Sequence, residues 1–497
     1  MNRIRDLREY LKVLKSLNDV DYIDREVSAI LEASAITRLS TEQLRPAPFF
    51  RDIEGYKKGF QMVGALGALS SDRRHPLGRI ALSLGLPYQT SAKELIDCLV
   101  EASQKPPIPP KLVPSKTAPC KQNILLGNEA TLDHFPIPLV HPDDGGRYVN
   151  TWGFIVAKTP DGRWTNWSIS RIQMLDGRHM TGLVLPQQHI GMVWQEWEKI
   201  GKPMPFAVVQ GGDPGAAVVG GMPIPADVDE VGVLGAIYGE PVEVVKCETN
   251  DLEVPATAEV VIEGHLSIKR DATEGPFAEF HGWALTETSP EPIYTIEAIT
   301  YRNDPIWPIC TTGRPADDSQ VAPALGVSAE IVLLLRNAGL PISMGWLLVE
   351  TSCHWMIVTV PRNWREILPG LTTSEFVHRI GEVMSANRVG RMCPVTYVLD
   401  DDIDPSNISD VLWALGTRIH PNLRHETWPV TILPWYLCYT EEERHHAKGS
   451  IAIHDGLLPP VEDERVRPAT FDNLYSPELR AKVIAAGNSS VRLGFDP

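Results

Sequence analysis

The stretch Glu259-Val260-Val261-Ile262-Glu263-Gly264-His265-Leu266-Ser267-Ile268 alternates two sets of side chains within a chain of 497 residues. Val260, Ile262 and Leu266 occupy every second position, and a period of two is typical of a β-strand. Residues 294–301 alternate in a similar way, and residues 164–171 combine β-favouring aromatic side chains with the same period. We therefore expect residues 125–310 to form mainly strands, arranged as a β-barrel or sandwich with inserted helices.

The flanking regions follow other patterns. Residues 4–18 place apolar side chains at three- and four-residue steps, as an amphipathic helix does. Four prolines within residues 105–111 interrupt regular structure and indicate a linker. Beyond residue 315, apolar helices alternate with strands, which favours a layered α/β region. The predicted fold class is α+β, with an N-terminal α/β region, a mainly β central domain and a C-terminal α/β domain over residues 1–115, 116–312 and 313–497.

Composition limits the classes of partner. The net charge is −17, from 46 basic and 63 acidic residues, which argues against nucleic acid or an anionic membrane as a partner. The N-terminal sequence is not of signal-peptide type, and no uninterrupted apolar run approaches a membrane span. Seven scattered cysteines without a C-x-x-C pair suit free thiols in a reducing compartment. These features predict a soluble cytoplasmic protein, in which an anionic substrate needs a local positive site.

One group of polar residues offers donors for a metal ion. Asn166 provides an amide oxygen, His189 an imidazole nitrogen and Glu243 a carboxylate. This hard, mixed set suits Mn²⁺ or Mg²⁺ better than zinc. Spacing alone leaves other interpretations open, because His189 can be a structural histidine and Glu243 an ordinary residue of a surface strand.

A second group suits carboxylate and proton chemistry. Arg171 presents a planar fork that matches a carboxylate, although a surface salt bridge is the common alternative. Glu274 and Glu279 flank Gly275-Pro276, so they belong to a shaped loop and not to a helix. Near an arginine, one carboxyl group can stay ionised while the other, desolvated, carries a proton; two exposed loop carboxylates are the alternative. Asn166 and Arg171 lie an odd number of residues apart, so one regular strand would point them to opposite faces. If both serve one site, the strand must bulge or end between them, or the ligand must straddle it.

A glycine-rich run over residues 211–223 matches neither G-x-G-x-x-G nor a P-loop. An ordinary dinucleotide-binding fold is therefore not expected. Glycines still allow the backbone to approach a cofactor or an ion closely.

Taken in order, the motifs resemble the UbiD-type decarboxylases, which use prenylated FMN. The resemblance extends over nearly the whole chain and is strongest for the ferulic acid and pyrrole-2-carboxylate decarboxylase branch. It implies that the central domain is a split β-barrel that binds the flavin, and that the C-terminal domain mediates oligomerisation, giving a homodimer or higher homo-oligomer. The motifs that carry it are residues 166–171, 186–190, 243–251, 254–256 and 274–279.

The resemblance also implies roles for single residues. Asn166, His189 and Glu243 would ligate Mn²⁺ beside the flavin phosphate. Arg171, Glu274 and Glu279 would form the catalytic triad. Backbone oxygens of Trp167, Gly220, Gly221 and Met222 would bind K⁺. The residues expected to contact the cofactor are Asn166, Trp167, Ser168, Ile169, Ser170, Arg171, Gln188, His189, Met222, Glu243 and Arg388; many relatives carry lysine at the last position.

The implied activity is reversible decarboxylation of an aromatic, heteroaromatic or α,β-unsaturated carboxylic acid. A carbanion on an sp² carbon needs an electron sink that side chains cannot provide. Arg171 would hold the carboxylate and Glu279 would protonate the carbon after CO₂ has left, and a flavin prenyltransferase would supply the cofactor. An FMN-dependent oxidoreductase on the same barrel and a non-enzymatic scaffold are the alternatives. Expected pocket residues are Phe280, Trp283, Leu457 and Leu458, with Asp317, Asp318, Cys353 and His354 as polar selectors.

Overall fold

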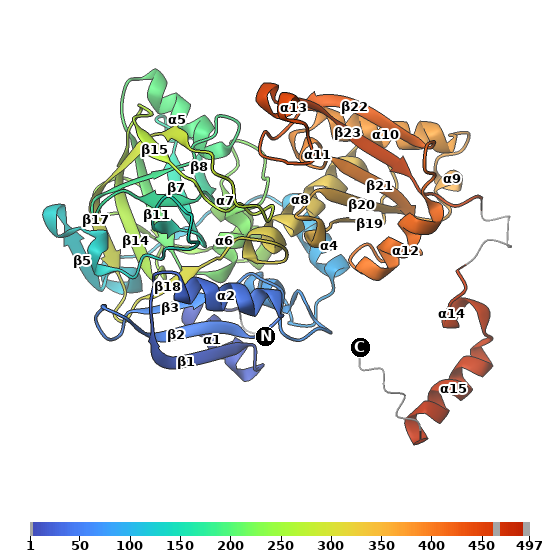
Figure 1. The fold of residues 1–497 in the computed structure, drawn as a ribbon, viewed down its shortest axis with the longest axis horizontal. Coiled ribbons are helices and arrows are strands. Elements are labelled where there is room, and N and C mark those ends of the chain that lie inside the picture. The colour runs from blue at the N-terminus through green and yellow to red at the C-terminus, as the bar shows by residue number, and fades with distance from the viewer. Residues whose placement is uncertain (1–2, 461–467, 491–497) are drawn as a thin grey trace.

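The computed structural model describes residues 3–460 and 468–490. Its sheets and helices form two lobes joined through a long helix, α8 (Asp318–Asn337) (Figure 1). One lobe contains the N-terminal region and the central domain, and the other contains the C-terminal domain. The model confirms the mixed class of helix and sheet.

The N-terminal sheet has the strand order β1 (Val20–Val27), β2 (Ala47–Ile53), β3 (Gln61–Gly64), β18 (Ile306–Ile309). The last strand comes from the end of the predicted central domain, so the two regions share a sheet. The predicted first helix is α1 (Leu7–Ser16), which buries Leu7, Tyr10, Leu11 and Leu14. The other helices of this region are α2 (Glu32–Glu42), α3 (Gly78–Ser83) and α4 (Ala92–Ser103).

The quoted stretch forms β14 (Val260–Leu266) at the centre of a curled, nine-stranded half-barrel sheet. Val260 and Ile262 face one hydrophobic core and Val261 faces the other, so the alternation separates two buried faces. The sheet order is β6 (Tyr148–Asn150), β9 (Ile172–Met174), β10 (His179–Gly182), β17 (Ile293–Tyr301), β14, β11 (Met204–Gln210), β7 (Gly153–Lys158), β8 (Thr165–Ser168), with β5 (Asn123–Leu126) beside β17.

Shorter elements decorate the half-barrel. The helices are α5 (His189–Lys199), α6 (Pro214–Gly220) and α7 (Glu230–Tyr238). A small sheet orders β13 (Glu253–Pro255), β12 (Glu243–Lys246) and β4 (Lys111–Leu112), and β15 (Ala272–Glu274) pairs with β16 (Ser289–Glu291). These elements carry the predicted site residues His189, Gly220, Glu243 and Glu274.

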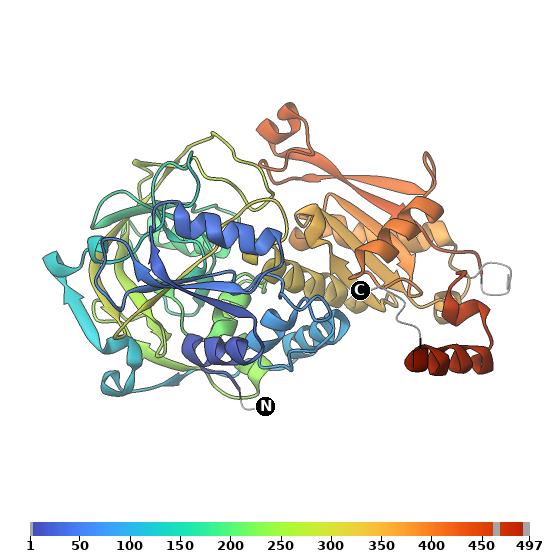
Figure 2. The same ribbon diagram turned by 60° about the horizontal axis from the view of Figure 1, so that its bottom comes forward.

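The C-terminal sheet has the order β19 (Met344–Leu347), β20 (Trp355–Val360), β21 (Val395–Asp400), β23 (Lys448–Asp455), β22 (His425–Thr431). It alternates with α9 (Trp364–Ile367), α10 (Thr373–Ala386), α11 (Arg388–Arg391), α12 (Ile408–Arg418) and α13 (Glu441–His446). The last helices, α14 (Phe471–Leu474) and α15 (Pro477–Ser490), stand apart from both lobes in either view (Figure 1, Figure 2).

Among the described residues, α8 alone is long and apolar enough to cross a membrane. Its most apolar window is 72% buried inside the structure, as expected for a core helix that packs against α4 and β19.

Candidate active site

Arg171 lies in the connection between two strands of the half-barrel. β8 ends at Ser168 and β9 begins at Ile172. β8 pairs with β7, whereas β9 pairs with β6 and β10. The strand therefore ends between Asn166 and Arg171, which is one of the arrangements that their odd spacing allows.

Two glutamates bind the Arg171 guanidinium from different sides. Nε and Nη2 donate to the two carboxylate oxygens of Glu274, each at 2.8 Å. Nη1 contacts Glu279. The Glu274 side chain is fully buried, whereas the Glu279 side chain is 18% exposed. The structure thus brings the three predicted catalytic residues together in two unequal environments.

Tyr148 and Phe277 complete this group, and the sequence reading missed both. The Tyr148 hydroxyl donates to Oε1 of Glu274 at 2.9 Å. The Tyr148 and Phe277 rings lie 4.3 Å apart, and the Arg171 guanidinium sits 5.2 Å from the Phe277 ring centre. Tyr148 is far from Glu274 in sequence, and no spacing pattern connects the two residues.

Asn166 and His189, two residues of the predicted metal group, share a contact with Glu230. Glu230 begins α7 and is buried. It accepts from Asn166 Nδ2 at 2.8 Å and from the Trp167 backbone N–H at 2.8 Å, and it lies 3.3 Å from His189 Nδ1. Within residues 3–460 and 468–490, no three His, Cys, Asp or Glu side chains form a metal cluster, so an ion here would also need the amide oxygen of Asn166.

Glu243, the carboxylate predicted for the metal group, contacts a lysine. This residue starts β12, which pairs with β4 in parallel, and its carboxylate binds Lys111 Nζ at 2.8 Å. The side chain is 43% exposed. Strand pairing therefore directs Glu243 toward a surface lysine, whereas the N-terminus of α7 directs Glu230 toward Asn166 and His189.

Backbone groups named for potassium meet where α6 ends beside β8. The Ile169 N–H donates to the Gly220 carbonyl at 3.3 Å. A Cβ atom on Gly220 would lie 3.7 Å from the Trp167 carbonyl oxygen. Gly221 and Met222 follow directly at the end of the helix. The end of α6 therefore lies beside the end of β8.

Arg388 adds a positive charge at the same end of the site. Its Nη1 donates to the Gln187 carbonyl at 3.0 Å, next to Gln188 and His189. Burial lowers the pKa of Arg388. The long side chain on α11 therefore reaches from the C-terminal lobe to the segment that precedes α5.

The residues expected to line the substrate pocket differ in their surroundings and in how far they are buried. The rings of Phe280 and His281 lie 5.8 Å apart, and His354 lies 4.1 Å from Tyr436. Burial lowers the pKa of His281 to about 4, and neither ring nitrogen has a partner in the described residues. Trp283, in contrast, is 60% exposed, and Leu457 and Cys353 are buried in the core.

Asp317 and Asp318 hold the start of α8. Asp317 caps the helix and binds Arg38 at 2.9 Å. Asp318 accepts from the Gly67 backbone N–H, and burial raises the pKa of Asp318 to about 7. Their contacts are those of structural residues and not of polar selectors.

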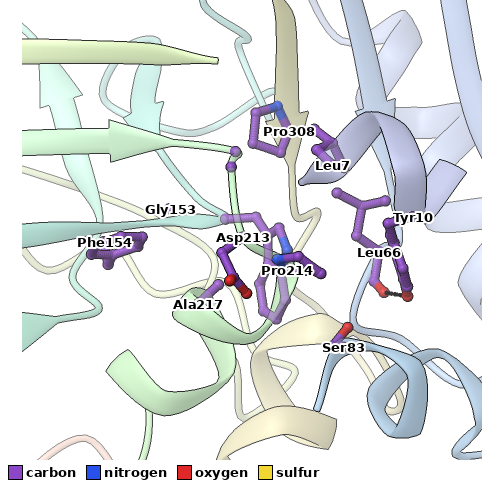
Figure 3. Close-up of a pocket in the computed structure, with 13 residues that line it drawn as sticks. Leu7, Tyr10, Leu66, Ser83, Gly153, Phe154, Asp213, Pro214, Ala217 and Pro308 are labelled. Carbon is purple, nitrogen blue, oxygen red and sulfur yellow. Dashed lines mark hydrogen bonds between the residues drawn. The ribbon is translucent and has the colours of Figure 1, made fainter. Parts of the chain in front are cut away.

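A small cavity between α1 and the start of α6 is separate from this site (Figure 3). Its volume of about 20 Å³ accommodates about one water molecule. Its walls include Tyr10, which bonds the Leu66 carbonyl at 2.9 Å, and Asp213. It is too small for an aromatic acid, and Arg171 does not line it.

Three family models match successive parts of the chain. They describe the N-terminal, Rift-related and C-terminal domains of 3-octaprenyl-4-hydroxybenzoate carboxy-lyase and cover residues 11–99, 111–315 and 320–425. The chain belongs to the UbiD family. It is accordingly a carboxy-lyase, as its curated relatives are.

Two of these relatives are similar to the UbiD-family chain over most of their length. Pyrrole-2-carboxylic acid decarboxylase of Pseudomonas aeruginosa is 35% identical over 487 residues, covering 97% of this chain and 98% of the relative. Ferulic acid decarboxylase 1 of Saccharomyces cerevisiae is 40% identical over 425 residues, covering 85% and 84%.

Solved structures share the UbiD architecture. Vanillic acid decarboxylase of Sedimentibacter hydroxybenzoicus, in open form, has a TM-score of 0.82 and 25% identity, covering 98% of this chain and all of that one. HmfF of Pelotomaculum thermopropionicum, in an evolved dimeric form with prFMN, has a TM-score of 0.77 and 23% identity, covering 96% of this chain and all of that one. At 23% identity, the comparison with HmfF shows a shared fold and no more.

Proposed function

We propose that this carboxy-lyase reversibly decarboxylates an aromatic, heteroaromatic or α,β-unsaturated carboxylic acid with prenylated FMN as the electron sink. The observation that supports this most is the Arg171 guanidinium held between a buried and a partly exposed glutamate. A carboxylate clamp beside a carboxyl group that can move a proton is what decarboxylation requires of the protein.

The donor sets fit the cofactor that the family implies. Asn166, His189 and Glu230 would hold Mn²⁺ at the phosphate end, where Arg388 adds a cation. Carbonyl oxygens of Trp167, Gly220, Gly221 and Met222 would hold K⁺. When bound, prenylated FMN supplies the electron sink that no side chain provides. The residues proposed to line the flavin are Ser168, Ile169, Ser170, Arg171 and Gln188.

The contacts of Arg171 suggest how the proton is delivered. Glu274 occupies two of its donors from a fully buried position, whereas Glu279 contacts Nη1 alone. A substrate carboxylate that binds Nη1 would displace Glu279 from its positive partner. Loss of that partner favours the protonated carboxyl, and Glu279 would then donate its proton to the carbon from which CO₂ has left.

The proposal includes two protein partners. A flavin prenyltransferase would supply the cofactor, as the family resemblance implies. A second copy of the chain would form a homodimer or larger homo-oligomer through the C-terminal lobe. A dimeric form of a structural relative supports the second expectation.

The activity is tested on protein co-expressed with a flavin prenyltransferase. Pyrrole-2-carboxylic acid and ferulic acid are offered separately, and CO₂ release is measured together with deuterium incorporation at the reacting carbon in D₂O. We expect release and incorporation for at least one acid. Turnover of neither acid, or redox turnover with a nicotinamide cofactor instead, would contradict the proposal.

A further inference from the structure

We propose that Tyr148 is a positioning residue that keeps Glu274 ionised, and so leaves the exchangeable proton of the site to Glu279. The inference rests on the proposed decarboxylase function. It concerns a residue that contacts neither the Arg171 side chain nor a metal-ligand candidate within hydrogen-bond distance in the described residues.

The Tyr148 hydroxyl joins the arginine pair to the loop that carries both acids. It lies 2.9 Å from Oε1 of Glu274, the oxygen that also accepts from Arg171 Nε. It lies 3.3 Å from the Pro276 carbonyl oxygen. Hydrogen bonds from Tyr148 and Arg171 to the same oxygen stabilise the ionised form of Glu274, so each of the two donors opposes its protonation.

The strand pair β6–β9 fixes this geometry. Tyr148 stands opposite Gln173, two residues after Arg171. Gln173 Oε1 accepts from the Gly275 backbone N–H at 2.9 Å. Two neighbouring side chains of one sheet edge thus hold consecutive residues of the loop, Glu274 by its carboxylate and Gly275 by its backbone.

The other charges near the loop have partners of their own. Glu291 binds Arg270, and burial raises the pKa of Glu291. Asp144 accepts from the Ala278 backbone N–H and lies 3.1 Å from His141 Nδ1. Within the described residues, the side chains that donate hydrogen bonds to the Glu274 carboxylate are Arg171, which also contacts Glu279, and Tyr148, while Glu291 on the paired strand β16 adds a like charge.

The hydroxyl remains a donor over the working pH range. Burial, followed by the charge of Glu274, raises the pKa of Tyr148 well above its ordinary value. Tyr148 is therefore not a proton source for the reaction. Its effect is exerted through Glu274, which is what distinguishes it from Glu279.

Tyr148→Phe keeps the ring that packs on Phe277 and removes the donor. A hydrogen bond to a charged group corresponds to about one to two pH units of proton affinity. We expect the acid limb of kcat/KM for the active acid, pyrrole-2-carboxylic or ferulic, to move up by about that amount. KM at the alkaline plateau should change by less than about threefold, because Arg171 and Glu274 remain paired there.

Tyr294→Phe is the matched control. Tyr294 is fully buried in β17, and its hydroxyl has no partner in the described residues. This variant should keep the wild-type pH profile. An equal shift in both variants would show a general effect of losing a buried hydroxyl and would overturn the inference.

A second measurement needs neither substrate nor cofactor. Infrared titration of the apoprotein follows the protonated-carboxyl band, and Glu274→Gln identifies the contribution of Glu274. Tyr148→Phe should move that contribution to higher pH, and 3-fluorotyrosine at position 148, a stronger donor, should move it to lower pH. If the band does not move in either variant while the wild-type holoenzyme is active, the role of Tyr148 is overturned and the proposed function stands. If the wild-type holoenzyme is inactive, the proposed function is overturned.

Discussion

Glu274 and Glu279 share one arginine and differ in what surrounds them. Glu274 is fully buried with both oxygens engaged by Arg171, and Glu279 is partly exposed with a single contact to the guanidinium. This difference supports our proposal that Glu274 holds the fixed charge and Glu279 the mobile proton.

Glu279→Gln tests that assignment. The amide cannot donate a proton as an acid does, and general acid catalysis contributes about 10²- to 10⁴-fold. We expect kcat for CO₂ release to fall by at least that factor while the absorbance of the bound flavin is retained. Wild-type turnover in this variant would show that another group protonates the product.

Glu230→Gln and Glu243→Gln form a matched pair for the metal site. Glu230 is buried against Asn166 and His189, and Glu243 binds Lys111 at the surface. We expect Glu230→Gln to lose bound Mn²⁺ and flavin, measured by elemental analysis and absorbance after purification. Glu243→Gln should retain both, and the reverse pattern would restore Glu243 as the ligand.

His281 makes stability depend on pH. Burial lowers the pKa of His281 to about 4 from its ordinary value of 6.5. Between pH 6.5 and pH 4 this histidine binds a proton in the unfolded chain but not in the folded chain. The free energy of unfolding therefore falls as the pH drops toward 4. Relative to wild type, His281→Asn should gain about 2 kcal/mol of unfolding free energy at pH 5 compared with pH 7. If the difference in unfolding free energy between His281→Asn and wild type is the same at pH 5 and pH 7, His281 takes up its proton in the folded chain as readily as in the unfolded chain, which would contradict this prediction.

For single residues, the sequence predicted which side chains belong to the site better than it predicted which side chains contact one another. Residue type and family resemblance named Arg171, Glu274 and Glu279, which the fold places together. They named Glu243 and not Glu230, although Glu230 is the carboxylate that contacts Asn166 and His189; the choice between them depends on the position of α7, which the sequence does not give. Tyr148 was unpredictable, since its role depends on a cross-strand pairing.

The elements were more predictable where one pattern continued over several residues. The alternation at β14 and the spacing of α1 correspond to the observed strand and helix. The inserted helices expected in the central domain include α5, which begins at His189. The pairing of β18 with β3 could not be predicted, because it joins residues far apart in the chain.

Two glycines test the packing of the elements. In β14 a Cβ on Gly264 would lie 1.9 Å from the Thr295 carbonyl oxygen, whereas a Cβ on Gly416 in α12 meets nothing within 4 Å. We expect Gly264→Ala to cost about 2 kcal/mol or more of unfolding free energy, as overpacking does. Gly416→Ala should stabilise by up to about 1 kcal/mol. Equal effects in chemical denaturation would mean that β14 and β17 are not packed as described.

For the whole molecule, the two lobes meet around α8 and α11. Arg388 on α11 reaches the Gln187 carbonyl, and the half-barrel provides Asn166, His189 and Glu230. A cofactor phosphate at this point would contact both lobes. The family resemblance predicted that residues of both lobes contact the cofactor. The position of one lobe against the other depends on contacts between side chains far apart in the chain, which the sequence pattern does not predict. The division at residues 115 and 312 remains a prediction.

The central claim is that this site works with prenylated FMN. The most direct test is the mass of the flavin released from protein co-expressed with a flavin prenyltransferase, measured alongside CO₂ release by the same preparation. The account predicts the mass of prenylated FMN and decarboxylation that is lost in Glu279→Gln. Plain FMN with redox turnover, or active protein without any flavin, would contradict it.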